Sequence, residues 1–279
     1  MTLTDSRRPI GTMVAYGFHE AVLDVDLGIA RRLGATVVEV LPDWRGLTDP
    51  VALGRRVHDC GLGVHSVHGC WGGRAIAADR VDLGSTDARV HRDSIDDLKR
   101  CLDWTGGAGA RCLVIHPGGL SSPRAAPDRR DALARGLNAL ADHAQGTGML
   151  VCVENMPPGV HPGSRMADLA DLIAEVNRAE VALAVDTGHA HMNTTAAEET
   201  RAAGARLVTT HVHDNDGQRD THLPPGEGSI DWLDWSSALD TVGYEGPVML
   251  ECIRHLRNEP TSLSASLLAL LERLATPGA

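Results

Sequence analysis

Eight short apolar runs alternate with segments whose apolar residues recur at helical spacing, and this alternation restricts the fold more than any other feature. The runs cover residues 10–16, 36–41, 63–68, 112–116, 150–154, 181–186, 207–213 and 247–252. The helical patterns cover residues 21–33, 50–60, 88–105, 129–145, 165–177, 196–203, 232–242 and 261–274. Eight strand–helix repeats predict an α/β protein that forms a single (β/α)8 TIM barrel.

The connections after the helical patterns are short, and those after the apolar runs are long. Glycine closes five helical patterns just before the next run, at Gly34, Gly61, Gly146, Gly204 and Gly243. Long segments rich in glycine and proline follow the runs instead, at residues 69–86, 117–127, 157–164 and 214–230. In a barrel these strand-to-helix loops build the functional face. No linker or shift in composition is seen, so residues 1–279 are predicted to form one domain.

Charge and cysteine usage restrict the setting of the protein. The net charge of −11 argues against a nucleic-acid partner, because nucleic acids attract basic surfaces. Neither a signal-peptide core nor an uninterrupted apolar run of about 18 residues is found, which argues against a membrane partner. Scattered cysteines without CxxC spacing favour reduced thiols and hence a cytoplasmic protein. They are Cys60, Cys70, Cys101, Cys112, Cys152 and Cys252.

Polar residues stand at or near the C-terminal ends of six consecutive apolar runs. A buried ionisable group is costly unless it is paired or bound to a metal, so six such positions in a row indicate a shared site at the rim of the barrel. The positions are His68, His116, Glu154, Asp186, His211 and Glu251.

The last four of these positions form the expected metal quartet, Glu154, Asp186, His211 and Glu251. Three carboxylates and one imidazole suit Mn²⁺, Zn²⁺ or Mg²⁺, and this mixture does not choose among the three ions. One divalent ion is the expectation, and up to three can be supplied with ligands.

Further donors surround the quartet, and for them metal binding and contact with substrate hydroxyls are equally open. His68 and His116 could bind a second ion shared with Glu154, and His189, Asp220 and His222 form a possible third group. Glu227 lies in the PGEG loop. These outer donors are His68, His116, His189, Asp220, His222 and Glu227.

Two other residues have a double interpretation, and a third has a single one. Glu39, near the end of its run, contacts either substrate or neighbouring backbone. Trp71 either lines the mouth of the pocket or packs against its neighbours. His213 shares a strand face with His211 by the period of two, which predicts that it supports that ligand by a hydrogen bond.

These motifs together resemble the xylose isomerase-like TIM barrels, which comprise sugar and sugar-phosphate isomerases and epimerases together with AP endonucleases of the endonuclease IV type. The resemblance covers nearly the whole chain through IHPGG, VENMP, VDTGH, HVHDND, DTHLPPGEGSIDW and MLEC. It implies that Glu154, Asp186, His211 and Glu251 are the metal ligands of the epimerases. It also matches His68, His116, His189, Asp220 and His222 to the extra ligands of the three-zinc endonucleases.

The resemblance implies a metal-dependent isomerase or epimerase that acts on a small sugar, sugar phosphate or polyol-like substrate through a metal-stabilised enediolate. Glu154 and Glu251 are then the acid/base pair. One alternative is a multinuclear zinc phosphodiesterase of the AP endonuclease type, against which the net charge argues. Another is a metal-dependent lyase or dehydratase that uses the same enolate chemistry. Exposed apolar positions on the terminal helices are compatible with a homodimer.

Overall fold

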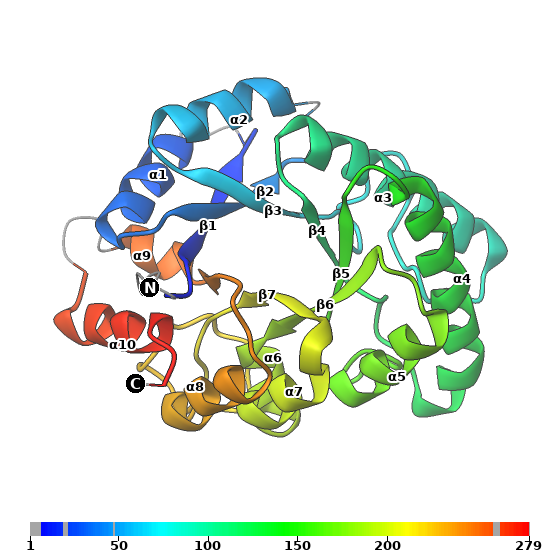
Figure 1. Cartoon of the computed structure of the whole chain (residues 1–279). Helices are drawn as coiled ribbons and strands as arrows, with labels where there is room; N and C mark the ends of the chain where they lie inside the picture. Colours follow the sequence, from blue (N-terminus) through cyan, green and yellow to red (C-terminus); the bar gives the residue numbers. More distant parts are fainter. Residues whose placement is uncertain (1–6, 19–21, 47, 259–262, 279) are drawn as a thin grey trace.

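The computed structural model describes residues 7–18, 22–46, 48–258 and 263–278. Eight parallel strands form one sheet in the order β7-β6-β5-β4-β3-β2-β1-β8, and helices surround it (Figure 1). The sheet closes between β7 and β8, where the Val212 amide donates to the Met249 carbonyl at 2.8 Å and Val212 bridges to Leu250. The predicted (β/α)8 barrel is therefore confirmed.

The strands are β1 Ile10–Tyr16, β2 Val37–Pro42, β3 Gly63–His68, β4 Cys112–Ile115, β5 Leu150–Glu154, β6 Val181–Asp186, β7 Leu207–His211 and β8 Val248–Leu250. The helices are α1 Val22–Arg32, α2 Pro50–Asp59, α3 Ala88–Gly107, α4 Ala126–Ala144, α5 Met166–Val176, α6 Thr187–Asn193, α7 Ala196–Ala203, α8 Trp232–Thr241, α9 Ile253–Asn258 and α10 Ala265–Ala275. Two 3₁₀ turns, Pro123–Ala125 and Gly204–Arg206, precede α4 and β7. Part of the helical pattern predicted at 261–274 lies outside the described residues.

Local sequence explains where the barrel helices begin and end. Asp49, Asp87 and Asp231 precede α2, α3 and α8, and each carboxylate accepts hydrogen bonds from the first free amides of its helix. At the other end, Gly243 has a φ of 65°, which lets the chain turn sharply into the strand that follows. The helices therefore stop close to the N-terminal ends of the strands.

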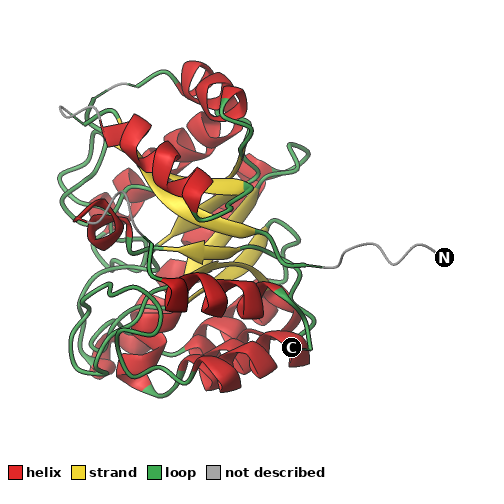
Figure 2. Cartoon of the chain, turned by 90° about the vertical axis from the view of Figure 1, so that its left-hand side faces the viewer, coloured by secondary structure: helices red, strands yellow, loops and turns green. Residues whose placement is uncertain are grey.

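Side chains on alternate strand positions fill two parts of the core. Leu113, Val153 and Leu183 belong to the large cluster between sheet and helices, whereas Cys112 and Cys152 belong to a small second cluster. That second cluster contains only small side chains, as the narrow interior of a barrel requires. Figure 2 shows the strands in the middle of the molecule with helices on both sides. Among the described residues, no helix is both long and apolar enough to span a bilayer.

Candidate metal and substrate site

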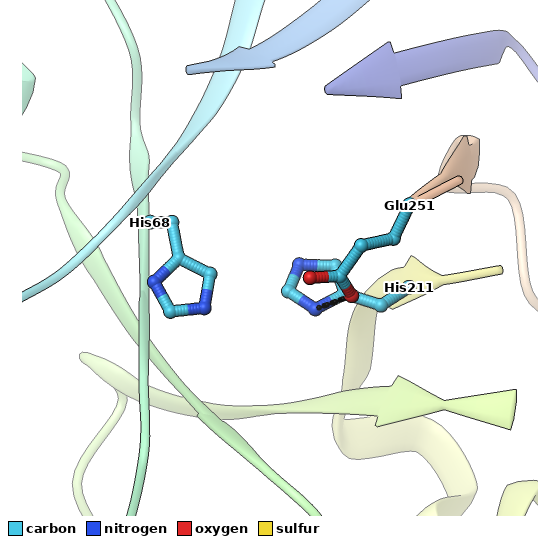
Figure 3. A group of neighbouring side chains, drawn as sticks. All are labelled: His68, His211 and Glu251. Carbon is cyan, nitrogen blue, oxygen red and sulfur yellow. Dashed lines mark ion pairs between the residues drawn. The ribbon is translucent and has the colours of Figure 1, made fainter. Parts of the chain in front are cut away.

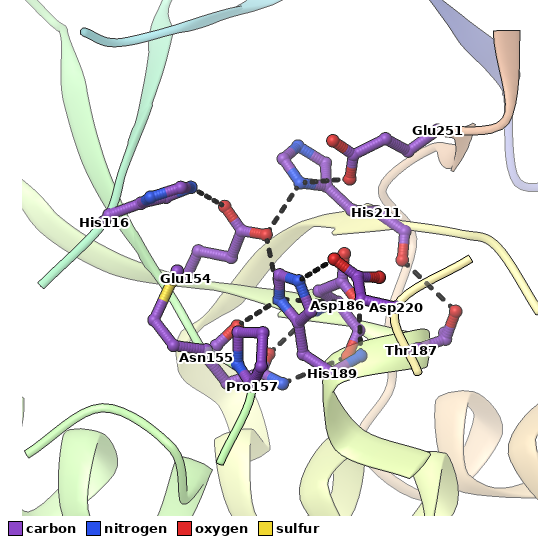
Figure 4. A network of polar contacts seen from close by, with 12 residues as sticks. His116, Glu154, Asn155, Pro157, Asp186, Thr187, His189, His211, Asp220 and Glu251 are labelled. Carbon is purple, nitrogen blue, oxygen red and sulfur yellow. Dashed lines mark hydrogen bonds and ion pairs between the residues drawn. The ribbon is translucent and has the colours of Figure 1, made fainter. Parts of the chain in front are cut away.

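The predicted quartet comes together at the C-terminal rim of the barrel (Figure 4). Glu154, Asp186 and His211 are the last residues of β5, β6 and β7, and Glu251 directly follows β8. One ligand atom from each of the four side chains lies within 4.8 Å of the other three. Convergence follows from the fold, because parallel strands bring their C-terminal ends to one rim.

The His211 ring is held with one nitrogen facing the quartet. Its Nε2 lies 2.8 Å from Glu39 Oε1, so Nε2–H donates to that carboxylate. Its Nδ1 lies 3.1 Å from Glu154 Oε1 and 3.0 Å from Glu251 Oε2, a contact drawn in Figure 3. Burial lowers the pKa of His211, but the carboxylates of Glu39, Glu251 and Glu154 raise it well above its ordinary value. Without a metal, the ring is therefore protonated.

This donor set fits a divalent cation. Glu154 Oε2 and Glu251 Oε2 are buried and form ion pairs with His116 Nε2 at 3.4 Å and His211 Nδ1 at 3.0 Å, but neither has a hydrogen bond from the described residues. Such oxygens are expensive to leave without a partner, and three carboxylates at one point repel one another. A cation ligated by His211 Nδ1 and the carboxylate oxygens would remove both costs.

A second donor group adjoins the quartet through Glu154. His68 Nε2 and His116 Nε2 lie 3.7 Å and 3.4 Å from Glu154 Oε2. His68 Nδ1 lies 2.9 Å from the carbonyl of Gly69 and donates to it, which leaves Nε2 as the free ligand atom. Glu154 therefore lies between two groups and offers one oxygen to each.

A third group lies beside Asp186. Two of its histidines, like His68, donate from Nδ1 to a backbone carbonyl and keep Nε2 available as a ligand atom. His189 Nδ1 donates to the Asn155 carbonyl and His222 Nδ1 donates to the Glu251 carbonyl, each at 2.9 Å. The Nε2 atoms of both rings lie 3.3 Å from Asp220 Oδ2. Burial lowers the pKa of both imidazoles, but neighbouring carboxylates raise it, to about 10 for His189 and about 9 for His222.

The structure corrects the interpretation of His213. Its Nε2 lies 3.1 Å from Asp186 Oδ2, and its ring stacks on His222 at a centroid distance of 4.0 Å. The period of two fails here because β7 ends at His211. His213 belongs to the third group, and a Cβ added at Gly188 would lie 1.9 Å from its Cε1. Glycine at 188 is the sequence signal for this close packing.

Glu39 and Glu227 are also placed differently from either expectation. Glu39 is 0% exposed and does not line the cavity; its side-chain hydrogen bonds among the described residues are with the Ser66 hydroxyl at 2.5 Å and with His211, not with backbone. Glu227 is exposed and is not among the described residues that line the cavity. The remaining outer donors all line the cavity described next: His68, His116, His189, Asp220 and His222.

A cavity of about 710 Å³ opens above the donor groups, within the usual range for small-molecule sites. Glu154 and Glu251 line it, whereas Asp186 and His211 lie beneath. Trp71 also lines it, and its ring packs edge-on against His68 at 4.7 Å, so both interpretations of Trp71 hold.

One buried ion pair ties together three of the loops around the cavity. Arg129 Nη2 lies 2.8 Å from Asp82 Oδ1, and the same guanidinium donates to the carbonyls of Gly119 and His161. These partners belong to the loops after β3, β4 and β5. The ion pair therefore fixes the wall of the cavity nearest to these strands.

Comparisons with known proteins agree with this architecture. Residues 27–274 match the family described as "Xylose isomerase-like TIM barrel". Fructoselysine 3-epimerase of Escherichia coli O157:H7 is 25% identical over 193 residues, which cover 62% of this chain and 64% of that protein. Inosose isomerase of Bacillus licheniformis is 23% identical, with 62% and 65% covered. The chain thus spans less than two thirds of the length of these relatives.

Solved structures show the same fold over almost the whole chain. A xylose isomerase domain protein from Planctomyces limnophilus has a TM-score of 0.74 at 21% identity, with 96% of each chain covered. An L-ribulose 3-epimerase has a TM-score of 0.74 at 19% identity, with 96% of this chain and 92% of that chain covered. Because the family match extends over most of the sequence, the protein belongs to the xylose isomerase-like TIM barrel family.

Proposed function

We propose that the protein is a divalent-metal-dependent epimerase or isomerase that acts on a sugar or polyol-like molecule. The proposal rests on the fact that only two of the four quartet residues are accessible from the cavity. The two glutamates, Glu154 and Glu251, line the cavity, while Asp186 and His211 lie beneath it. Relatives named as epimerases and isomerases of sugars and an inosose support the same class of reaction.

The proposed chemistry needs two carboxylates that reach one carbon of the substrate from different directions. Glu154 and Glu251 extend from strands on different parts of the barrel wall, and each has one oxygen without a hydrogen bond from the described residues. One glutamate removes the proton next to the carbonyl, and the other returns a proton on the opposite face of the resulting enediolate. When bound, the cation would supply Lewis-acid stabilisation of the negative charge on the substrate oxygens.

A second candidate is a multinuclear zinc hydrolase that cleaves phosphodiesters. It is favoured by the donor groups themselves, because Glu154 belongs to two of them and Asp186 links the quartet to the third. Against it, Arg254 is the one Lys or Arg among the described residues that line the cavity. A phosphate-bearing polymer needs several such contacts.

Metal content separates the two candidates. Protein purified without chelators and analysed by elemental mass spectrometry is expected to contain about one divalent ion per chain, held by the quartet. Removal of that ion with a chelator should eliminate turnover, and its return should restore turnover. About three zinc ions per chain would favour the hydrolase, and full activity of a metal-free sample would contradict both candidates.

Metal uptake is expected to release protons. In the metal-free protein at pH 7, His189 and His222 are protonated, since their pKa values are raised to about 10 and about 9. An imidazole must lose a proton before it can ligate, so the metal affinity of the quartet should rise with pH as His211 loses its proton, and that of the third group should rise towards the pKa values of His189 and His222. Calorimetry in buffers of different ionisation enthalpy measures the number of protons released when metal binds. About one proton per chain, from His211, is expected if metal fills only the quartet. Release of about three protons would indicate that the third group fills as well.

A further inference from the structure

We propose that the natural substrate is a sugar that carries an apolar or aromatic substituent, and that one side of the cavity binds this substituent. This side, the apolar lip, consists of Trp71, Leu120, Met156, Pro157, Pro158 and Val160. The inference rests on the proposed function for the sugar part, and it adds a binding site for the rest of the substrate.

The apolar lip lies on one side of the barrel mouth. Its residues belong to the loops that follow β3, β4 and β5, which are neighbours in the sheet. Leu120 is 83% exposed, and its loop is joined to the loop after β5 by a hydrogen bond of 2.8 Å from the Ser121 amide to the Gly159 carbonyl. An exposed leucine in a fixed apolar wall of a cavity indicates a surface that a ligand covers.

The size of the cavity favours a substrate larger than a free monosaccharide. A volume of about 710 Å³ lies in the upper part of the range of about 300–1,000 Å³ that is typical for drug-sized ligands. A single sugar with its cation would leave much of this space to water. A substituent that reaches the apolar lip would fill it.

The polar side chains of the cavity are too few for a larger carbohydrate. Apart from the donor groups and the indole N–H of Trp71, the polar side chains among its described lining residues are Thr221, Arg254 and His255. All three follow β7 or β8 in the chain, on another part of the rim from the apolar lip. The hydroxyls of a second sugar placed on the lip would lose water and find only the indole N–H of Trp71 as a side-chain partner, which opposes binding. An apolar group meets no such cost.

Trp71 links the apolar lip to the donor groups. One contact of its ring is with His68, at a centroid distance of 4.7 Å, and the guanidinium of Arg74 lies 5.0 Å from the ring centroid. These contacts hold the indole in place. The substituent would therefore lie directly beside the sugar part held above the quartet.

Binding of matched sugars tests the inference. D-fructose with a phenyl-bearing group at C1 or at C6 should bind the Mn²⁺-loaded protein about tenfold more tightly or better than the methyl-bearing counterpart, measured by calorimetry. Leu120→Ser should remove this preference and leave the affinity for unsubstituted fructose unchanged. Leu233→Ser is the control, because Leu233 is 54% exposed on α8 and does not line the cavity. Equal affinity for phenyl and methyl sugars at both positions would overturn the inference.

A second readout separates this inference from the proposed function. Exchange of the substrate hydrogen next to the carbonyl is followed by NMR in deuterated water. A phenyl preference without any exchange would contradict the epimerase and support the apolar lip. Exchange at equal rates in phenyl and methyl sugars, with no difference in affinity, would support the epimerase and contradict the apolar lip.

Discussion

Replacement of Glu154 or Glu251 by glutamine is expected to lower interconversion of the two substrate epimers by about 10²- to 10⁴-fold. The amide keeps the size of the side chain but cannot take up a proton from carbon. Interconversion needs both carboxylates, because one removes the proton and the other returns it on the opposite face. Each single variant should therefore lose it, although the two glutamates come from different strands.

The experiment must separate loss of the proton acceptor from loss of the metal. Both glutamates also belong to the expected ligand set, so metal content is measured on the same samples and turnover is compared at saturating Mn²⁺. Glu175→Gln is the control, since that side chain is 68% exposed and pairs with Arg130 on the outside of the barrel. Interconversion at the normal rate in either active-site variant would refute the acid/base assignment.

The quartet was predictable because its assembly depends on the fold alone. Alternating strands and helices force parallel strands, and parallel strands place their C-terminal residues at one rim. The positions of Glu154, Asp186 and His211 at the rim could be predicted from their places at the ends of their strands alone. Glu251 needed little more, as it directly follows β8.

The contact between Glu39 and His211 could not be predicted in the same way. The two residues belong to β2 and β7, which are not neighbours in the sheet. Their side chains meet inside the barrel, so the contact depends on strand stagger around the whole ring. Spacing along the sequence gives no measure of that stagger.

Loop residues were unpredictable for a different reason. Asp214 accepts hydrogen bonds from the amides of Gly226 and Ile230 and from the indole of Trp232. These bonds fold the loop after β7 back on itself and leave Glu227 exposed. A cluster of acidic residues in the sequence does not reveal which carboxylate binds backbone amides and which one faces outward. The short helices α6 and α9 were not predicted. Each begins directly after a predicted strand, at Thr187 and at Ile253.

Glu39→Gln is expected to weaken divalent-metal binding by about 10- to 100-fold while the protein stays folded. Glu39 can only accept hydrogen bonds, from His211 Nε2 at 2.8 Å and from Ser66 Oγ at 2.5 Å. This arrangement keeps the hydrogen of the neutral ring on Nε2 and presents the lone pair of Nδ1 to the quartet. A glutamine can instead donate to Nε2, which favours the tautomer whose hydrogen points from Nδ1 into the metal site.

Metal affinity, rather than activity alone, decides whether Glu39 has this role. Affinities for Mn²⁺ and Co²⁺ are measured by calorimetry, and the melting temperature of the metal-free protein is measured in parallel. Glu199→Gln is a matched control, because it removes another buried carboxylate that does not belong to the quartet. Glu199 Oε1 pairs with Arg165 Nε at a distance of 2.7 Å. That control should lower the melting temperature without changing metal affinity. A Glu39→Gln protein with the affinity of the parent would show that Glu39 only fills the barrel interior, and the geometry of His211 would then need no carboxylate partner.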